Sequence, residues 1–331
     1  MINRLRLGAA ALVAVAAIAL TACQATAPDA GNRPAECDGV TLTKVGYSPY
    51  SNTGGYFPFV EKGLTEGFEP CGITVTTSDP DADSGKQVSG IENLVAAGAK
   101  AVIVTPTDPK AVSPIAKRLK DQGVLVVGLA TSIPEADITF NLDDHAFGRL
   151  EGTSAGDWLK ENRAGEKPKV AILHQDSGGD PLIDRHQGAI DGIDEVLGEG
   201  NWDLVSEVEA YQEDTGNAQT SVILQAHPDL DLIIGLNDSS ALGAVSAITS
   251  SGRTAGKDVG VVTGGEDKRI LDYVLSSQVV STVGLFPVAQ GNVIADTVLK
   301  FARGESVERE QIVPVELVTA DNAQSILDSL S

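Results

Sequence analysis

Long apolar runs are scarce in this 331-residue chain, and after Leu20 none is long enough to span a bilayer as a helix. Aromatic residues are also few, with seven Phe, five Tyr and two Trp. The four histidines are scattered along the sequence without metal-ligand spacing, and no Walker or dinucleotide-binding glycine motif occurs. We therefore predict no second membrane span, no cofactor and no metal site.

Positive charge is in short supply as well. The chain has 24 Lys and Arg against 46 Asp and Glu, a formal net charge of −22. Affinity for nucleic acid depends on basic residues that neutralise phosphates, and an anionic membrane surface repels an acidic protein. The composition thus argues against nucleic-acid partners and against a domain that lies flat on a membrane.

The N-terminus has the features of an export signal. A basic start precedes the apolar run Leu7–Leu20, which ends in Leu-Thr-Ala before Cys23. This pattern is typical of bacterial lipoproteins, in which the cysteine is diacylated; the alternative is an ordinary secretory signal with a chance cysteine. We predict a signal peptide over residues 1–22, lipidation of Cys23 and a flexible tether over 23–37. The protein would then be anchored to the outer face of the cytoplasmic membrane by its lipid alone.

The other two cysteines, Cys37 and Cys71, form an even pair in an oxidising compartment, which favours a disulfide. Each lies just before a predicted strand, so adjacent parallel strands would bring both to one edge of a sheet. The alternative is two unpaired buried thiols.

Short apolar runs alternate with amphipathic stretches along the rest of the chain, which predicts parallel sheets covered by helices on both faces. The predicted strands are 41–47, 73–77, 101–105, 125–129, 170–174, 205–210, 230–236, 259–263 and 279–284. The predicted helices are 56–66, 86–97, 109–121, 147–161, 183–196, 218–226, 239–250, 267–276 and 288–303. The segment starting at Ala101 is echoed by the one starting at Asp231, each an apolar strand followed by Thr or Asn, Asp and a helix. We predict an α/β fold of two Rossmann-like lobes with parallel-sheet cores. Ligands of such open sheets bind beyond the carboxyl ends of the strands, here in a cleft between the lobes.

At this point the chain resembles the ribose- and galactose-type solute-binding proteins of bacterial sugar importers. The segments that carry the resemblance are Tyr47–Gly63, Val104–Asp108, Asp184–Gly188, Ala226–Asp229 and Leu236–Gly243. The resemblance implies the type I periplasmic-binding-protein fold, with three hinge crossings. We place the N-terminal lobe at residues 38–143 plus 286–316 and the C-terminal lobe at 144–285 plus 317–331.

Sugars need aromatic rings for their C–H faces and convergent polar groups for their hydroxyls. By the family's pattern, Tyr56, Phe57 and Tyr211 would line the cleft. The alternative role for each is that of a core aromatic. For Phe59, the core is the stronger interpretation. Arg185 matches the family's second-lobe arginine; its alternative role is an ion pair.

Asn237 matches a family amide, and its alternative role is that of a turn residue. Asp108 and Asp238 each start a helix and are expected to cap it.

The chain departs from the ribose-type pattern at three polar positions. Ala130-Thr131 replaces an Asp-Arg pair, Gly264-Gly265-Glu266 replaces an aspartate, and Leu285 replaces a glutamine. These departures put ribose itself in doubt and leave other monosaccharides, polyols and less polar solutes open. The predicted ligand-binding residues are Tyr56, Phe57, Thr131, Asp144, Gln175, Arg185, Tyr211, Asn237 and Glu266.

The function that the resemblance implies is that of a monomeric extracytoplasmic solute-binding lipoprotein of an ABC importer, which binds a small carbohydrate or polyol and delivers it to a membrane permease. A sensory receptor of the same fold is the alternative. Enzymatic activity is not expected: the Ser177 loop resembles that of a serine protease but lies in an α/β chain. The Asp79–Asp83 loop departs from a calcium-binding loop in its glycine and its final acid, so a solvated turn is the simpler interpretation.

Overall fold

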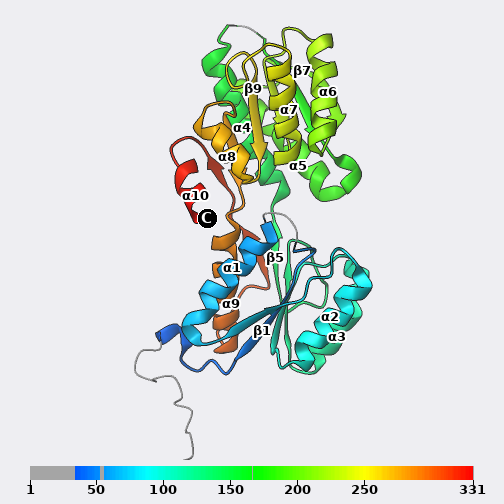
Figure 1. The fold of residues 1–331 in the computed structure, drawn as a ribbon, viewed down its shortest axis with the longest axis vertical. Coiled ribbons are helices and arrows are strands. Elements are labelled where there is room, and N and C mark those ends of the chain that lie inside the picture. The colour runs from blue at the N-terminus through cyan, green and yellow to red at the C-terminus, as the bar shows by residue number, and fades with distance from the viewer. Residues whose placement is uncertain (1–33, 53–55, 166, 331) are drawn as a thin grey trace, which may run out of the picture. The chain divides into compact units, whose positions relative to one another are not determined.

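The computed structural model describes residues 34–330, apart from 53–55 and 166 (Figure 1). The predicted signal peptide, the predicted lipidation site Cys23 and most of the predicted tether lie outside the described residues. Among the described residues, no helix combines the length and the apolar character needed to cross a membrane.

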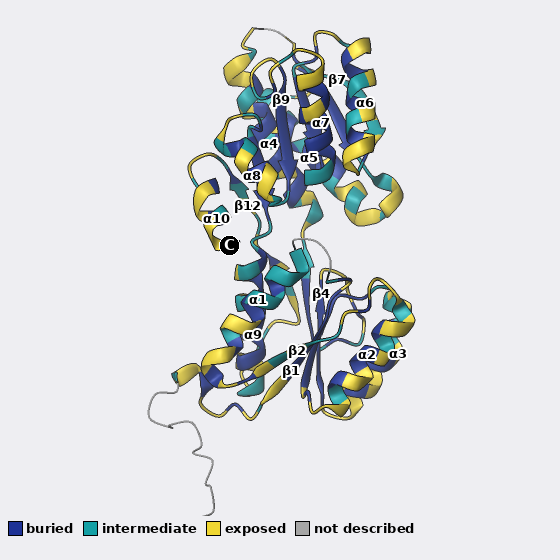
Figure 2. Cartoon of the chain, in the orientation of Figure 1, coloured by how far each residue is buried: buried dark blue, intermediate teal, exposed yellow. Residues whose placement is uncertain are grey.

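The first lobe is built on a six-stranded sheet in the order β11-β5-β4-β3-β1-β2, and all its paired strands are parallel. Its strands are β1 (Lys44–Ser48), β2 (Thr74–Thr77), β3 (Ala101–Val104), β4 (Leu125–Leu129), β5 (Ile138–Leu142) and β11 (Glu310–Val313). Strands β3 and β4 are buried along their whole length, as expected for central strands of a parallel sheet (Figure 2).

Helices cover this sheet on two sides. Helices α1 (Tyr56–Phe68) and α9 (Pro287–Ala302) contribute to one apolar cluster, which includes Leu64 and Val298. Helices α2 (Ser84–Ala96) and α3 (Pro109–Asp121) contribute to another, which includes Ile91 and Ile115. Burial of both sheet faces explains why the central strands read as continuous apolar runs.

The second lobe has a six-stranded sheet in the order β12-β10-β9-β8-β6-β7. Its strands are β6 (Lys169–His174), β7 (Asp203–Glu209), β8 (Leu232–Gly235), β9 (Gly260–Gly264), β10 (Ser281–Gly284) and β12 (Glu316–Val318). Its helices are α4 (Asp144–Asn162), α5 (Asp180–Leu197), α6 (Glu213–Ala226), α7 (Asp238–Ser250), α8 (Lys268–Leu275) and α10 (Ala323–Ser329). Apolar residues of α4 and α5 form one core cluster, and those of α7, α8 and α10 belong to another.

The predicted fold class is confirmed, with one refinement: β12 runs antiparallel to β10, so the second sheet is not wholly parallel. The chain passes between the sheets after β5, after β10 and after β11. Four short elements, β5, β11, β12 and α10, were not predicted. They span three to seven residues, and none is a continuous apolar run like those of β3 and β4.

The predicted disulfide between Cys37 and Cys71 is present, with 5.2 Å between the Cα atoms. It joins the segments that lead into the paired parallel strands β1 and β2. The tether was predicted too long at its C-terminal end, because Ala35–Cys37 forms a 3-10 turn and Cys37 is fully buried.

Candidate ligand-binding site

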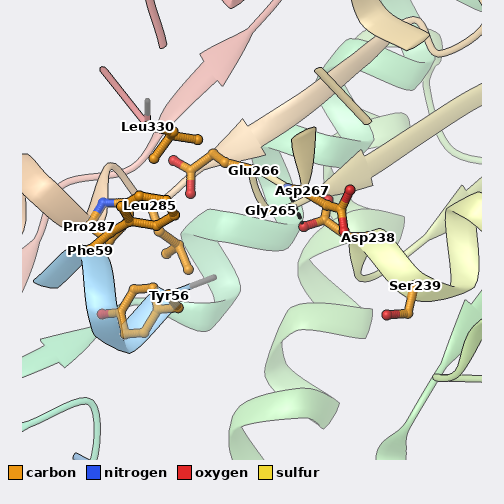
Figure 3. A pocket seen from close by; sticks show the side chains of 10 residues that line it. All are labelled: Tyr56, Phe59, Asp238, Ser239, Gly265, Glu266, Asp267, Leu285, Pro287 and Leu330. Atoms are coloured by element: carbon orange, nitrogen blue, oxygen red, sulfur yellow. Dashed lines mark hydrogen bonds between the residues drawn. The ribbon is translucent and has the colours of Figure 1, made fainter. Parts of the chain in front are cut away.

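A cavity of about 380 Å³ lies where α1 of the first lobe meets loops of the second lobe (Figure 3). This volume suits a small solute. Aromatic side chains of α1 and acidic groups at the carboxyl end of the second sheet share its lining. The lining residues are Tyr56, Phe59, Asp238, Ser239, Gly265, Glu266, Asp267, Leu285, Pro287 and Leu330.

Hydrogen bonds fix the chain crossing beside this cavity. Gln290 of α9 donates from Nε2 to the Leu285 carbonyl at 2.6 Å and accepts from the Tyr56 hydroxyl at 2.5 Å. The carboxylate of Glu266 accepts from the Phe286 amide at 2.5 Å. Residues from α1, α9, the crossing and the loop after β9 are thereby tied together.

Two acidic side chains of the cavity sit in surroundings that disfavour their charge. Burial raises the pKa of Glu266 to about 7, against a smaller opposing effect of hydrogen bonds from the Phe286 and Leu285 amides. Burial also raises the pKa of Asp238 well above its usual range, although its Oδ2 accepts from the Asp267 amide at 2.9 Å (Figure 3). Both groups can therefore hold a proton and donate a hydrogen bond as well as accept one.

Gly265, between these two acids, is a position where only glycine fits. Its φ is +119°, and a Cβ there would lie 2.1 Å from Oδ2 of Asp238. The missing side chain lets the loop approach Asp238.

Arg185 of α5 lies in the second lobe, outside the residues that line this cavity. Its Nε donates to Asp144 at 3.0 Å, its Nη1 donates to the Leu236 carbonyl at 3.3 Å, and its guanidinium lies 4.1 Å above the centre of the Phe147 ring. Burial raises the pKa of Asp144, and the charge of Arg185 partly offsets that rise. The ion pair considered as an alternative for Arg185 is thus present.

Asn237 and Tyr211 lie next to this pair. The Asn237 side chain caps α7 by accepting from the Ser240 amide, and it donates to the Tyr211 carbonyl at 3.0 Å. Burial raises the pKa of the Tyr211 hydroxyl, and the nearby charge of Arg185 opposes that rise. Both the oxygen and the nitrogen of the Asn237 side-chain amide therefore have partners within the protein. This is the turn role given above as its alternative.

The fold does not bring all the predicted site residues together. Tyr56 and Glu266 line the 380 Å³ cavity, whereas Asp144, Arg185, Tyr211 and Asn237 cluster in the second lobe. Phe57 packs edge-on against Tyr56, with 5.0 Å between ring centres. Gln175 precedes a 3-10 turn, and Thr131 is exposed after β4; neither lines this cavity.

Sequence reasoning missed several residues of the cavity. Phe59 packs against an apolar core cluster, in line with the core interpretation, but it also lines the cavity. Asp238 was expected to cap its own helix, but Asn237 is the cap. Leu330 lines the cavity, and Gln290 holds the Tyr56 hydroxyl beside it; neither gave a signal in the sequence, because these contacts join segments far apart in the chain. Where ribose-type relatives have a glutamine, this chain has Leu285. Here Gln290 of α9 donates a hydrogen bond to the Leu285 carbonyl.

Two motifs set aside in the sequence have structural roles. In the acidic loop, Asp79 accepts from the Asn52 and Asp81 amides, and Asp83 caps α2. Ser177 donates its hydroxyl to Glu209 at 2.7 Å. The four histidines are scattered in the sequence, yet two of them meet in the fold, where the rings of His174 and His186 stack with 4.5 Å between centres.

The chain belongs to the periplasmic binding protein domain family, whose model matches residues 45–306. It is 30% identical over 258 residues to a D-ribose/D-allose-binding protein of Pseudomonas aeruginosa, covering 72% of this chain and 76% of that protein. It is 25% identical to a xylitol-binding protein of Mycolicibacterium smegmatis, covering 98% of this chain and 88% of the relative.

Among solved structures, the chain is similar to a periplasmic ribose ABC transporter protein from Conexibacter woesei. The TM-score is 0.75 at 25% identity, and the match covers 87% of this chain and 95% of the other. Members of this family are binding proteins, so the chain is a solute-binding protein and not an enzyme.

Proposed function

We propose that this protein is an extracytoplasmic solute-binding lipoprotein of an ABC importer, which binds a small carbohydrate or polyol between its lobes and delivers it to a membrane permease. The observation that carries the proposal is the cavity in which Tyr56 of the first lobe shares a lining with Asp238, Glu266 and Asp267 of the second. The relatives named for ribose, allose and xylitol support a polyhydroxylated solute.

The chemistry of the lining suits such a solute. An aromatic ring stacks on the C–H face of a sugar, and carboxyl groups exchange hydrogen bonds with hydroxyls. A ligand that contacts both lobes stabilises their closed arrangement, because only contacts that differ between the two arrangements shift the balance. Of the proposed ligand contacts, Tyr56 and Glu266 line the cavity; the others, proposed to reach the ligand when the lobes close on it, are Phe57, Thr131, Asp144, Gln175, Arg185, Tyr211 and Asn237.

Titration calorimetry of the mature chain against pentoses, hexoses, linear polyols and cyclitols tests the ligand class. We expect saturable binding of one member, weakened at least about tenfold by Arg185→Lys, because lysine loses the planar fork of donors. Arg118→Lys, an exposed arginine paired with Glu92 on the first lobe, is the matched control. A folded protein that binds no member of the panel would refute the carbohydrate or polyol assignment.

The importer role needs a separate test. Deletion of the gene should abolish uptake of the identified ligand, and re-expression should restore it. Unchanged uptake with a lost transcriptional or chemotactic response would favour the sensory alternative.

Membrane attachment through Cys23 is tested by labelling cells with an alkyne fatty acid. We expect label on the wild-type protein and none on Cys23→Ala, with Cys23→Ala released into the soluble extracytoplasmic fraction. Equal labelling of both proteins would exclude Cys23 as the anchor.

A further inference from the structure

Three potential metal ligands converge at the end of β6, outside the residues that line the ligand cavity. They are His174, the last residue of β6; Asp176, in the 3-10 turn that follows; and His186, on α5. One ligand atom from each lies within 4.8 Å of the others. The sequence hides this group because His186 comes ten residues after Asp176, on a different element.

The spacing of the atoms suits a tetrahedral ion. Nδ1 of His174 lies 2.9 Å from Oδ1 of Asp176, and Nδ1 of His186 lies 3.1 Å from the same oxygen. Bonds of about 2.0 Å in a tetrahedral zinc site separate neighbouring ligand atoms by about 3.3 Å. The two rings stack at an interplanar angle of 16°, so one ring must also turn for both Nδ1 lone pairs to point at the ion; that turn and a widening of a few tenths of an ångström would admit it.

Hydrogen bonding at His174 also favours a cation. The Asp176 amide donates to Nδ1 of His174 at 3.3 Å, so this nitrogen presents a lone pair. A lone pair cannot donate to the carboxylate oxygen 2.9 Å away. Nδ1 has a single lone pair, so a cation bound by both atoms would take that lone pair in place of the long hydrogen bond from the amide, and the conflict with the carboxylate would be removed.

Two of the three side chains are largely buried, whereas the third is accessible to solvent. The side chains of His174 and His186 are 12% and 9% exposed, whereas Asp176 is 35% exposed. The imidazoles are thus held by packing, and the carboxylate leaves a route for an ion and for a water ligand. Two imidazoles and one carboxylate match zinc and similar divalent transition metals rather than calcium or magnesium.

We propose that His174, Asp176 and His186 form a site for a divalent transition metal of the zinc type. The ion cross-links the end of β6 to α5, one residue from Arg185, and so stabilises the segment that carries Arg185. Metal binding would then raise the stability of the second lobe without being part of the ligand cavity.

Zinc titration of the untagged, chelator-treated mature chain tests the proposal, with binding followed by calorimetry and stability by thermal unfolding. We expect one saturable site and a higher unfolding temperature. His174→Gln and Asp176→Asn should each weaken binding by at least the roughly 10–100-fold that loss of a supporting partner causes.

His145→Gln is the matched control, since His145 pairs with Asp191 at 3.0 Å on the exposed face of α4 and lacks a second histidine. It should leave zinc affinity unchanged. Should the histidine variant fail to fold, Asp176→Asn and the visible spectrum of the cobalt-substituted wild-type protein decide the question. Saturable binding that survives in Asp176→Asn, an octahedral cobalt spectrum, or absence of saturable binding would each overturn the proposal.

Discussion

Arg185 and Asp144 form an ion pair with little solvent around it, the two side chains being 11% and 15% exposed. Removing one partner of such a pair leaves an uncompensated charge and costs about 3–5 kcal/mol. We expect Asp144→Ala to lower the free energy of unfolding by about 3 kcal/mol, and the double variant Asp144→Ala/Arg185→Met to recover much of that loss. Urea unfolding of Asp144→Ala, Arg185→Met and the double variant measures the coupling free energy between the two residues. Losses of unfolding free energy that simply add in the double variant would contradict this coupling.

Glu266 makes the stability of the protein depend on pH. Its pKa rises from 4.5 to about 7 on folding, so the native state binds more protons than the unfolded state and stability falls as pH rises through this window. This interval corresponds to about 3 kcal/mol. Glu266→Gln should abolish this contribution to the loss of stability with rising pH.

The measurement is the difference in unfolding free energy between Glu266→Gln and wild type at pH 5 and at pH 8. Relative to wild type, we expect Glu266→Gln to gain about 2–3 kcal/mol of unfolding free energy between pH 5 and pH 8. Glu161→Gln, on the exposed side of α4, controls for loss of one acid. A difference independent of pH would show that Glu266 is charged throughout.

At the scale of elements, α4 and α5 pack backbone to backbone through glycines. A Cβ at Gly148 would lie 1.9 Å from the Arg185 carbonyl oxygen, and one at Gly152 would lie 2.0 Å from that of Ala189. Any side chain here must push the helices apart. This close contact brings Arg185 of α5 within reach of Asp144, at the start of α4.

Gly152→Ala should therefore destabilise the protein by about 3 kcal/mol, the upper end of what overpacking usually costs. Gly85→Ala in α2 is the matched control, because the nearest atom to its new Cβ is a side-chain oxygen of Asp83 at 3.3 Å. Alanine's higher helix propensity should make that control neutral or stabilising by up to about 1 kcal/mol. Thermal unfolding of the two variants compares them, and equal midpoints would refute the role of the glycine contact.

At the scale of the whole molecule, acidic residues outnumber basic ones by 46 to 24. Such an excess destabilises the compact state by self-repulsion, which salt screens. We expect the unfolding midpoint to rise when sodium chloride increases from about 0.02 to 0.5 M, a range over which the screening length falls several-fold. Calorimetric scans in the two buffers measure this, and a lower midpoint at high salt would mean that the surface ion pairs dominate.

Local features of the sequence determined most of the secondary structure. Asp108 caps α3 and Pro109 begins it, so the helix was predicted with its observed bounds of Pro109–Asp121. Strand β4 was likewise predicted at Leu125–Leu129, because it is buried on both faces and reads as a continuous apolar run. Strand β11 was not predicted. Its first residue, Glu310, is exposed, and the segment forms a strand through its pairing with the parallel strand β5, which depends on the tertiary structure.

The sequence by itself thus determined the alternation of strands and helices and the disulfide partners, and it predicts Tyr56 and Glu266 as ligand contacts, which the fold places at one cavity. Only the tertiary structure decided which side chains meet there. Tyr56 and Gln290 are 234 residues apart, yet they share a hydrogen bond. His174 and His186 stack only because β6 and α5 bring them together. Local patterns encode periodicity and caps, whereas contacts between distant segments depend on how whole elements pack.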